Sequence, residues 1–165
     1  MGRIGRAVAQ RGRGFGMQIH YHNRSRLSDE LEQGATFHET PESLLAVSEF
    51  FSINAPSSAD TLKFLNAERI ALLPDGAVVA NTARGNMVDD EALINALQSG
   101  KLAAAGLDVF DGEPNIHPGY RSLDNVFLLP HLGSATHETR DAMGFCCLDN
   151  LDAFFSGKAC PSPLT

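Results

Sequence analysis

Three residues that can take part in chemistry lie at, or shortly after, the ends of expected strands. The strands are short apolar runs of the kind that is buried on both faces of a parallel sheet. They are expected at AVVANTA (77–83), LAAAGLDVF (102–110) and VFLLP (126–130). Arg84 comes at the end of the first run, Glu113 shortly after the second and His131 after the third. Open α/β sheets bind ligands beyond the carboxyl ends of their strands, so we expect a guanidinium, a carboxylate and an imidazole to share one ligand-binding edge.

Each of these residues alone has an ordinary explanation, because a single arginine is usually a surface residue and a single histidine a loop residue. All three residues follow strands, and each has a glycine or proline within two residues. This common position favours a ligand-binding site over the ordinary explanations. The helix between the first two strands supports the placement. Asp89 is a suitable N-cap, and Gly100 is typical of the position just past a helix end.

The composition is that of a globular domain. The chain has 165 residues, of which 43% are hydrophobic, an ordinary proportion for a packed core. No apolar run approaches the ~18 residues of a membrane span, so we expect no membrane partner. The three cysteines show no metal-ligand spacing, so we predict no metal site. They suit a reducing compartment, and the cytoplasm is the expected location.

The net charge of −7 is unevenly distributed. Residues 1–28 contain six arginines and no acid, whereas the remainder contains seven Lys or Arg against 20 Asp or Glu. The basic end is expected to face an anion, while the acidic remainder argues against a nucleic-acid partner. An arginine-rich start is also typical of a mitochondrial transit peptide. Such peptides are rich in serine, however, and this start contains a glycine-punctuated helix that leads into a strand.

The N-terminal segment resembles part of a dinucleotide-binding motif. The sequence GRIG (2–5) opens an amphipathic helix, and a strand is expected over 17–22. Glycines at the mouth of a helix let its N–H groups and dipole bind a pyrophosphate. In the turn NRSR (23–26) no acid is present to bind a ribose 2′-hydroxyl. Arg24 and Arg26 could hold a 2′-phosphate instead, and the alternative is a solvated basic turn.

Strands that alternate with helices along the whole chain predict an α/β fold with a doubly wound parallel sheet. Further helices are expected over 28–35, 40–48, 66–76 and 135–157, and a further strand over 50–56. The last helix carries an apolar stripe that we expect to pack in a core. The stripe consists of Met143, Cys147, Leu148, Leu151 and Phe154.

Four segments resemble the D-isomer-specific 2-hydroxyacid dehydrogenases, especially the glyoxylate/hydroxypyruvate reductase branch. They are MGRIGRA, INAPSSADT, the run over 76–114 and LLPHLGSATHETRDAMG. The resemblance implies a Rossmann-like NAD(P)-binding domain over 1–150 that lacks its first strand, followed by a segment, 151–165, that returns to a substrate domain. We therefore expect an N-terminally truncated fragment, inactive alone, of an enzyme that is a homodimer when intact.

The resemblance also implies the roles of the three residues at the strand ends. Arg84 matches the arginine that pairs with the substrate carboxylate, to which a planar guanidinium is well suited. His131 matches the acid/base that protonates the substrate carbonyl oxygen, and Glu113 the carboxylate that favours its imidazolium form. The implied reaction is reduction of a 2-oxo acid, such as glyoxylate or hydroxypyruvate, with hydride from NAD(P)H.

The implied cofactor contacts are spread along the chain. NADP(H) is favoured, with NAD(H) as the alternative, because the ribose turn is basic. The matching positions are Gly2, Arg3, Ile4 and Gly5 at the pyrophosphate, Asn23, Arg24 and Ser25 at the adenosine ribose, Pro56 and Thr61 on the adenine side, Thr82 and Ala83 before the arginine, and Asp108 and Ser134 at the nicotinamide end.

Two other interpretations exist. Corepressors with this fold bind NAD(H) without catalysis, and the presence of Arg84, Glu113 and His131 favours the enzyme over them, although some corepressors keep a similar set. Formate dehydrogenases are disfavoured, because they pair their histidine with a glutamine rather than with a glutamate such as Glu113.

Overall fold

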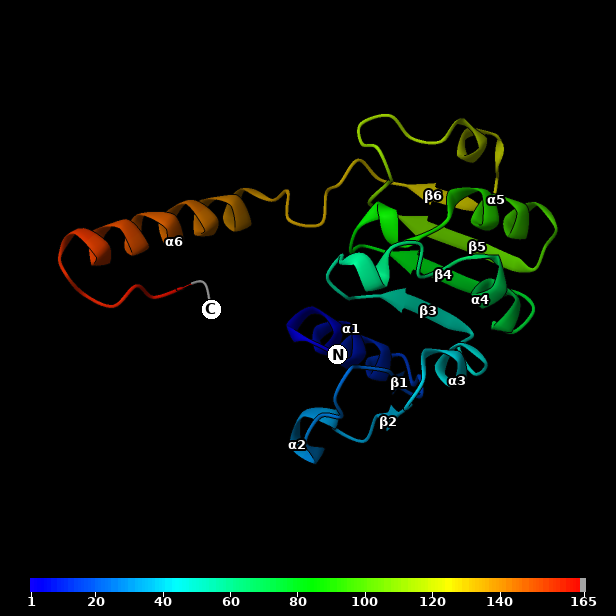
Figure 1. Cartoon of the computed structure of the whole chain (residues 1–165), viewed down its shortest axis with the longest axis horizontal. Coiled ribbons are helices and arrows are strands. Elements are labelled where there is room, and N and C mark those ends of the chain that lie inside the picture. Colours follow the sequence, from blue (N-terminus) through cyan, green and yellow to red (C-terminus); the bar gives the residue numbers. More distant parts are fainter. Residues whose placement is uncertain (164–165) are drawn as a thin grey trace. The chain divides into compact units, whose positions relative to one another are not determined.

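The computed structural model describes residues 1–163, and the chain divides into two compact units, with the boundary in the sequence between Pro130 and His131. The first unit holds two parallel sheets (Figure 1). One sheet pairs β1 (His20–Tyr21) with β2 (Thr36–Phe37). The other has the order β3-β4-β5-β6, with bounds β3 (Phe50–Ile53), β4 (Ala77–Asn81), β5 (Leu102–Leu107) and β6 (Val126–Leu128). The expected nucleotide-binding domain over 1–150 stays a prediction.

The division into two sheets is a difference from the single sheet that a doubly wound fold suggests. Strands β1 and β3 belong to separate sheets. The interruption falls where the doubly wound order 3-2-1-4-5-6 has its first strand, the one that the sequence pattern lacks. The fold class, α/β with parallel strands, is confirmed.

In the first unit α1 precedes β1, and the other helices lie between successive strands. Their bounds are α1 (Arg3–Gly14), α2 (Asp29–Glu32), α3 (Pro41–Leu45), α4 (Ala67–Leu72) and α5 (Asp90–Gln98), with short 3₁₀ helices η1 (Ala59–Thr61), η2 (Gly85–Met87) and η3 (Pro118–Ser122). The side chain of Asp89 accepts a hydrogen bond from the Ala92 N–H, which confirms it as the N-cap of α5. Gly100 adopts a φ of +77°, the left-handed conformation expected after this helix.

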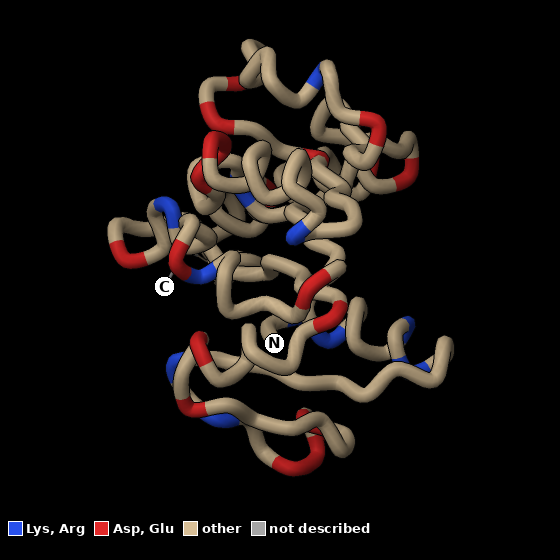
Figure 2. Tube along the Cα trace, turned by 90° about the vertical axis from the view of Figure 1, so that its right-hand side faces the viewer, with Lys and Arg blue, Asp and Glu red and all other residues tan. Residues whose placement is uncertain are grey.

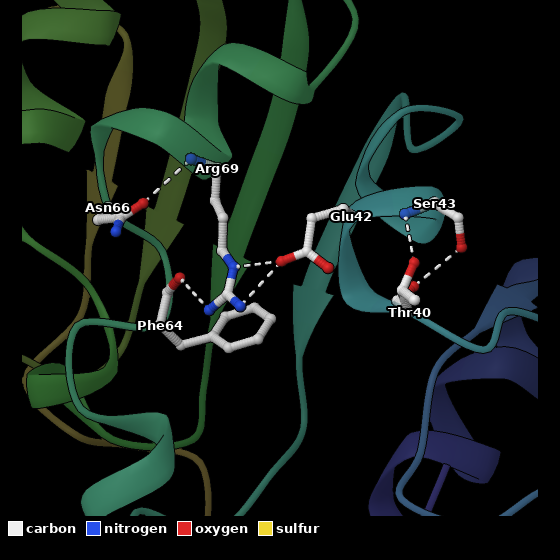
Figure 3. A network of polar contacts seen from close by, with 6 residues as sticks. All are labelled: Thr40, Glu42, Ser43, Phe64, Asn66 and Arg69. Carbon is white, nitrogen blue, oxygen red and sulfur yellow. Dashed lines mark hydrogen bonds and ion pairs between the residues drawn. The ribbon is translucent and has the colours of Figure 1, made fainter.

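One hydrophobic core joins β3, β4 and β5 to α4 and α5. Leu45, Leu65, Val79, Leu93 and Leu102 are completely buried in it. A polar network ties α3 to α4 above this core (Figure 3). The guanidinium of Arg69 donates from Nε and Nη2 to Oε1 of Glu42 and lies 4.3 Å from the ring centroid of Phe64. The two helices are therefore held together on the surface as well as through the core.

The observed strands are shorter than the apolar runs that predicted them. The run over 77–83 forms a strand only to Asn81, and the expected strand over 17–22 is reduced to His20 and Tyr21. The run over 77–83 stops early because the side chain of Asn81 bonds the backbone of the residues that follow it. Strand β2 has no counterpart in the sequence-based expectations.

The second unit contains α6 (His137–Phe155), and here the core-packing expectation is wrong. Met143, Leu148 and Phe154 expose 60, 56 and 68% of their surface, and α6 has no buried residue. Apolar residues such as Phe145 and Phe155 lie outside the expected stripe, so the helix is not amphipathic in the way that core packing requires.

Charges of both signs are interspersed along the trace (Figure 2). No helix within residues 1–163 combines the length and apolar character that a bilayer crossing needs.

Candidate functional site

The strands of the larger sheet end level with one another. Ile53 pairs with Asn81, Asn81 with Leu107, and Leu107 with Leu128, so β3 to β6 finish along one line. The loops that follow these strands therefore start at the same edge of the sheet. The sequence-based expectation that several chemically active residues are delivered to one edge is confirmed for the loops after β4 and β5.

Asn81 shapes the turn that carries Arg84. Its side chain is 1% exposed at the end of β4. Its Oδ1 accepts from the Ala83 N–H at 3.0 Å, and its Nδ2 donates to the Arg84 carbonyl at 2.9 Å. The Arg84 guanidinium is exposed and donates to the Ala83 carbonyl. Sequence reasoning missed Asn81, although a single amide that ends a buried apolar strand is a recognisable signal.

Gly85 brings the Arg84 turn against the loop after β5. A Cβ at Gly85 would lie 1.8 Å from the carbonyl carbon of Phe110 and 2.2 Å from the Asp111 nitrogen, so only glycine fits. In the same loop the Phe110 N–H donates to Oε1 of Glu113 at 2.8 Å. This contact explains how Arg84 and Glu113, 29 residues apart, belong to one piece of structure.

Asp108 lies at the base of the same loop. It is 4% exposed, and its N–H donates to the Asn81 carbonyl at 3.0 Å. Thr82 is exposed and Ala83 partly buried on the neighbouring turn. The three predicted cofactor residues thus follow the ends of adjacent strands.

The start of α1 has the features of an anion site. Gly2 is its N-cap, and no side chain caps the helix, so its first N–H groups are available to a ligand. A Cβ at Gly2 would meet no atom of the described chain within 4 Å. Gly5 is buried, and a Cβ there would lie 3.6 Å from the Cβ of Asn54. Nearby, Oδ1 of Asn54 is buried without a hydrogen-bond partner among the described residues. Arg3 and Ile4 are exposed on the first turn.

The turn predicted to bind the ribose, residues 23–26, is joined to this helix start. The Met1 nitrogen donates to Oδ1 of Asn23 at 2.6 Å, which joins the two predicted cofactor segments. Arg24 and Ser25 are exposed. Arg26 is instead engaged by Glu32, with Nε 2.8 Å from Oε1 and Nη2 3.0 Å from Oε2. Of the two guanidinium groups that the sequence places at this turn, Arg26 thus binds a carboxylate of the protein, and whether the turn holds a phosphate stays a prediction.

Hydrogen bonds of the Thr61 hydroxyl hold the loop after β3 in shape. Oγ1 of Thr61 accepts from the Ser58 N–H at 2.8 Å and donates to the Pro56 carbonyl at 3.0 Å. The hydroxyl of Ser57 donates to Oδ1 of Asn86 at 3.0 Å, which links this loop to the one after β4. Pro56 and Thr61 thus form one braced loop at the same sheet edge.

His131 and Ser134 belong to the second unit. His131 comes three residues after the last residue of β6 and has a φ of +56°, an uncommon left-handed conformation for a non-glycine residue. Its pairing with Glu113 stays a prediction. Among the described residues, no cluster of three or more His, Cys, Asp or Glu is suited to hold a metal ion.

The parallel sheet, the uncapped glycine-bounded helix and the loops at the carboxyl edge define a nucleotide-binding α/β protein of the Rossmann-like class. A sequence model described as "D-isomer specific 2-hydroxyacid dehydrogenase, NAD binding domain" matches residues 1–133. The chain therefore belongs to the D-isomer specific 2-hydroxyacid dehydrogenase family.

Similar proteins support this assignment. The chain is 51% identical over 158 residues to a glycerate dehydrogenase of Hyphomicrobium methylovorum, covering 94% of this chain and 49% of that protein. It is 46% identical over 162 residues to a glyoxylate reductase of Thermococcus onnurineus, covering 98% of this chain and 48% of the relative. The chain thus spans about half the length of the curated relatives it matches.

Solved structures show the same fold. A protein from Polaromonas described as "putative D-isomer specific 2-hydroxyacid dehydrogenase, NAD-binding" superposes with a TM-score of 0.97 at 55% identity, covering 100% of this chain and 52% of that one. An NADPH-dependent glyoxylate/hydroxypyruvate reductase from Sinorhizobium meliloti, in complex with NADP and malonate, superposes with a TM-score of 0.93 at 41% identity, covering 99% and 50%.

Proposed function

We propose that the intact protein is an oxidoreductase that reduces a small 2-oxo acid, such as glyoxylate or hydroxypyruvate, with hydride from NAD(P)H. The observation that carries the proposal is the Gly85 contact, which locks the Arg84 turn to the Glu113 loop at the carboxyl edge of the sheet. A cationic group and a carboxylate are thereby fixed at the edge where open α/β sheets bind their ligands.

Arg84 has the chemistry to anchor the substrate. Its guanidinium is exposed, and a planar fork of N–H donors matches a carboxylate in a bidentate manner. We assign to His131 the proton transfer to the substrate carbonyl oxygen and to Glu113 the stabilisation of its imidazolium form. Asp108, Thr82, Ala83 and Ser134 are assigned to the nicotinamide end of the site.

The N-terminal segments are assigned to the other end of the cofactor. Gly2, Arg3, Ile4 and Gly5 would hold the pyrophosphate through the N–H groups of α1, and the open space at Gly2 supports close approach of a phosphate. When bound, the nicotinamide supplies the hydride. Asn23, Arg24 and Ser25 would bind the ribose, with the loop of Pro56 and Thr61 beside the adenine.

We further propose that NADPH is preferred to NADH. The support is the exposed guanidinium of Arg24 in a turn without an acid, and the NADP-bound relative from Sinorhizobium meliloti has the same fold. A charge-assisted contact contributes roughly 1.5 to 3 kcal/mol, which corresponds to about tenfold or better discrimination.

The assembly and location are also proposals. Residues 1–150 form the NAD(P)-binding domain, and residues 151–165 return to a substrate domain. The intact enzyme works as a homodimer in the cytoplasm.

Steady-state kinetics of the intact protein tests the proposal. Glyoxylate, hydroxypyruvate and an unrelated aldehyde are assayed with NADPH and with NADH, and kcat/KM is compared. Turnover of the 2-oxo acids and not of the aldehyde is expected, with the higher kcat/KM for NADPH. Absence of turnover with either nucleotide contradicts the reductase assignment. Equal efficiencies that Arg24→Ala does not change contradict the cofactor preference alone.

A further inference from the structure

Three side chains, the buried Tyr21 and Glu32 and the exposed Arg26, form a polar cluster beside the proposed ribose turn. The hydroxyl of Tyr21 donates to Oε1 of Glu32 at 2.5 Å and accepts from the Leu27 N–H at 3.0 Å. The guanidinium of Arg26 reaches the same carboxylate through both Nε and Nη2. The turn that starts at Asn23 is thus held at its far end by a backbone contact and by an ion pair.

The cluster is anchored to the fold on the side away from solvent. Tyr21 is 3% exposed in β1, and Glu32 is 4% exposed at the end of α2. Arg13, in the last turn of α1, donates from Nη2 to the Glu32 carbonyl at 2.7 Å. The Glu32 carboxylate is therefore held in a fixed position, and the exposed side chain of Arg26 forms an ion pair with it.

The Glu32 carboxylate is charged throughout the neutral range. Its hydrogen bonds from Arg26 and from Tyr21 lower the pKa of Glu32 to about 2. Both carboxylate oxygens of Glu32 accept hydrogen bonds from the Arg26 guanidinium. The positive charge of Arg26 is therefore compensated by Glu32. Arg24, two residues earlier and exposed, has no hydrogen bond or ion pair with any described residue.

We propose that Glu32 is a positioning residue for cofactor selection: it clamps Arg26, and through it the turn, so that Arg24 is the guanidinium presented to the 2′-phosphate. The inference rests on the proposed use of NADPH. In this arrangement Arg24 is the specificity residue, and Tyr21, Arg26 and Glu32 act on the phosphate only through the position of the turn.

A pair of adenine nucleotides isolates the effect of the 2′-phosphate. Adenosine 2′,5′-bisphosphate and adenosine 5′-monophosphate differ only in that group, and neither contains the nicotinamide. Their dissociation constants are measured by calorimetry with the intact protein and with Arg24→Gln and Glu32→Gln. Arg121→Gln, which removes an exposed arginine from η3, is the control for a simple loss of positive charge.

The expected results separate three roles of Glu32. The unmodified protein binds the bisphosphate about tenfold more tightly than the monophosphate, and Arg24→Gln removes that preference. Glu32→Gln lowers the preference at least about threefold, with less than about twofold change for the monophosphate, and has no further effect in the Arg24→Gln background. If Glu32→Gln weakens the binding of both nucleotides equally, the role of Glu32 is purely structural. If Glu32→Gln binds the bisphosphate more tightly, the released Arg26 itself binds the 2′-phosphate. Either result overturns the proposal.

Tyr21→Phe provides an independent test, and it decides the question if Glu32→Gln does not fold. It removes only the phenol oxygen and leaves the Arg26 ion pair in place, so a smaller loss of the same preference is expected. If Glu32→Gln does not fold, an unchanged preference in Tyr21→Phe overturns the inference. If Glu32→Gln folds, an unchanged preference in that variant overturns it. A preference ratio of one in the unmodified protein has a different meaning, because it contradicts the proposed use of NADPH itself.

Discussion

Gly85 lies directly against the peptide bond that follows Phe110. The position that a Cβ would take at Gly85 is 1.8 Å from the Phe110 carbonyl carbon, well inside the closest approach of two carbon atoms. The contact is between two backbone segments, so neither can move aside as a flexible side chain would. Through it, the geometry of the Arg84 turn depends on the loop that holds Glu113.

We expect Gly85→Ala to lower the free energy of unfolding by about 3 kcal/mol or more, because a methyl group forced between two backbones is an extreme case of overpacking. The kcat/KM of the intact protein should fall as well, since Arg84 moves with the turn. Thermal or chemical unfolding monitored by circular dichroism measures the first effect. Gly144→Ala in α6 is the matched control: its Cβ meets open space, and a change of at most about 1 kcal/mol in the stabilising direction is expected. Equal effects of the two substitutions contradict the argument.

Asn81→Asp keeps the size of the buried side chain and removes a donor. The Nδ2 that donates to the Arg84 carbonyl is replaced by an oxygen that repels it, so a loss of about 1 to 3 kcal/mol is expected at neutral pH. The loss should be smaller in mild acid, where a protonated carboxyl can donate again. Urea unfolding at pH 7 and pH 5 measures it. Asn95→Asp, at an exposed position of α5, should change stability by less than about 0.5 kcal/mol, and a comparable loss there would show that charge rather than the turn is responsible.

His131→Ala and Arg84→Ala should affect different kinetic constants in the intact protein. Loss of the proposed proton donor, His131, is expected to lower kcat by roughly 10² to 10⁴, whereas loss of the proposed carboxylate anchor, Arg84, should act largely by raising KM. Steady-state kinetics with glyoxylate and NADPH separates the two. Arg121→Ala serves as the control for the loss of an exposed arginine. A full kcat in His131→Ala would exclude this histidine as the acid.

The ion pair behind the ribose turn should make stability depend on pH in a defined window. The folded-state pKa of Glu32, about 2, lies below the ~4.3 of an unfolded glutamate, so its contribution is complete above that value and is lost as the pH falls toward 2. Thermal melts between pH 5 and pH 2.5 should therefore be less pH-dependent for Glu32→Gln than for the unmodified protein. Arg26→Gln should show part of the same flattening, because its guanidinium is the main cause of the shift. Identical slopes in all three proteins would contradict the assignment.

The sequence by itself determined the class of the fold and the sheet edge at which Arg84 and Asp108 emerge. Apolar runs rich in Val and Ala predicted β4 and β5, and Asp89 and Gly100 marked the ends of α5. These features are visible in the sequence because residues close together along the chain are enough to specify a buried strand or a helix cap. Residues that follow such strands must emerge at the carboxyl edge, whatever the rest of the chain does. The sequence therefore predicted that Arg84 and Asp108 lie at this edge of the sheet.

Only the tertiary structure decided how these residues are held. The backbone contact of Gly85 with Phe110 joins positions 25 residues apart, and the carboxylate of Glu32 binds Arg26 from another element. A basic turn looks the same in sequence whether or not its arginines are already paired. The apolar residues of α6 likewise cannot reveal whether the chain covers them. Contacts between distant segments depend on how close the folded backbone brings them, and no local pattern of residue types encodes that distance.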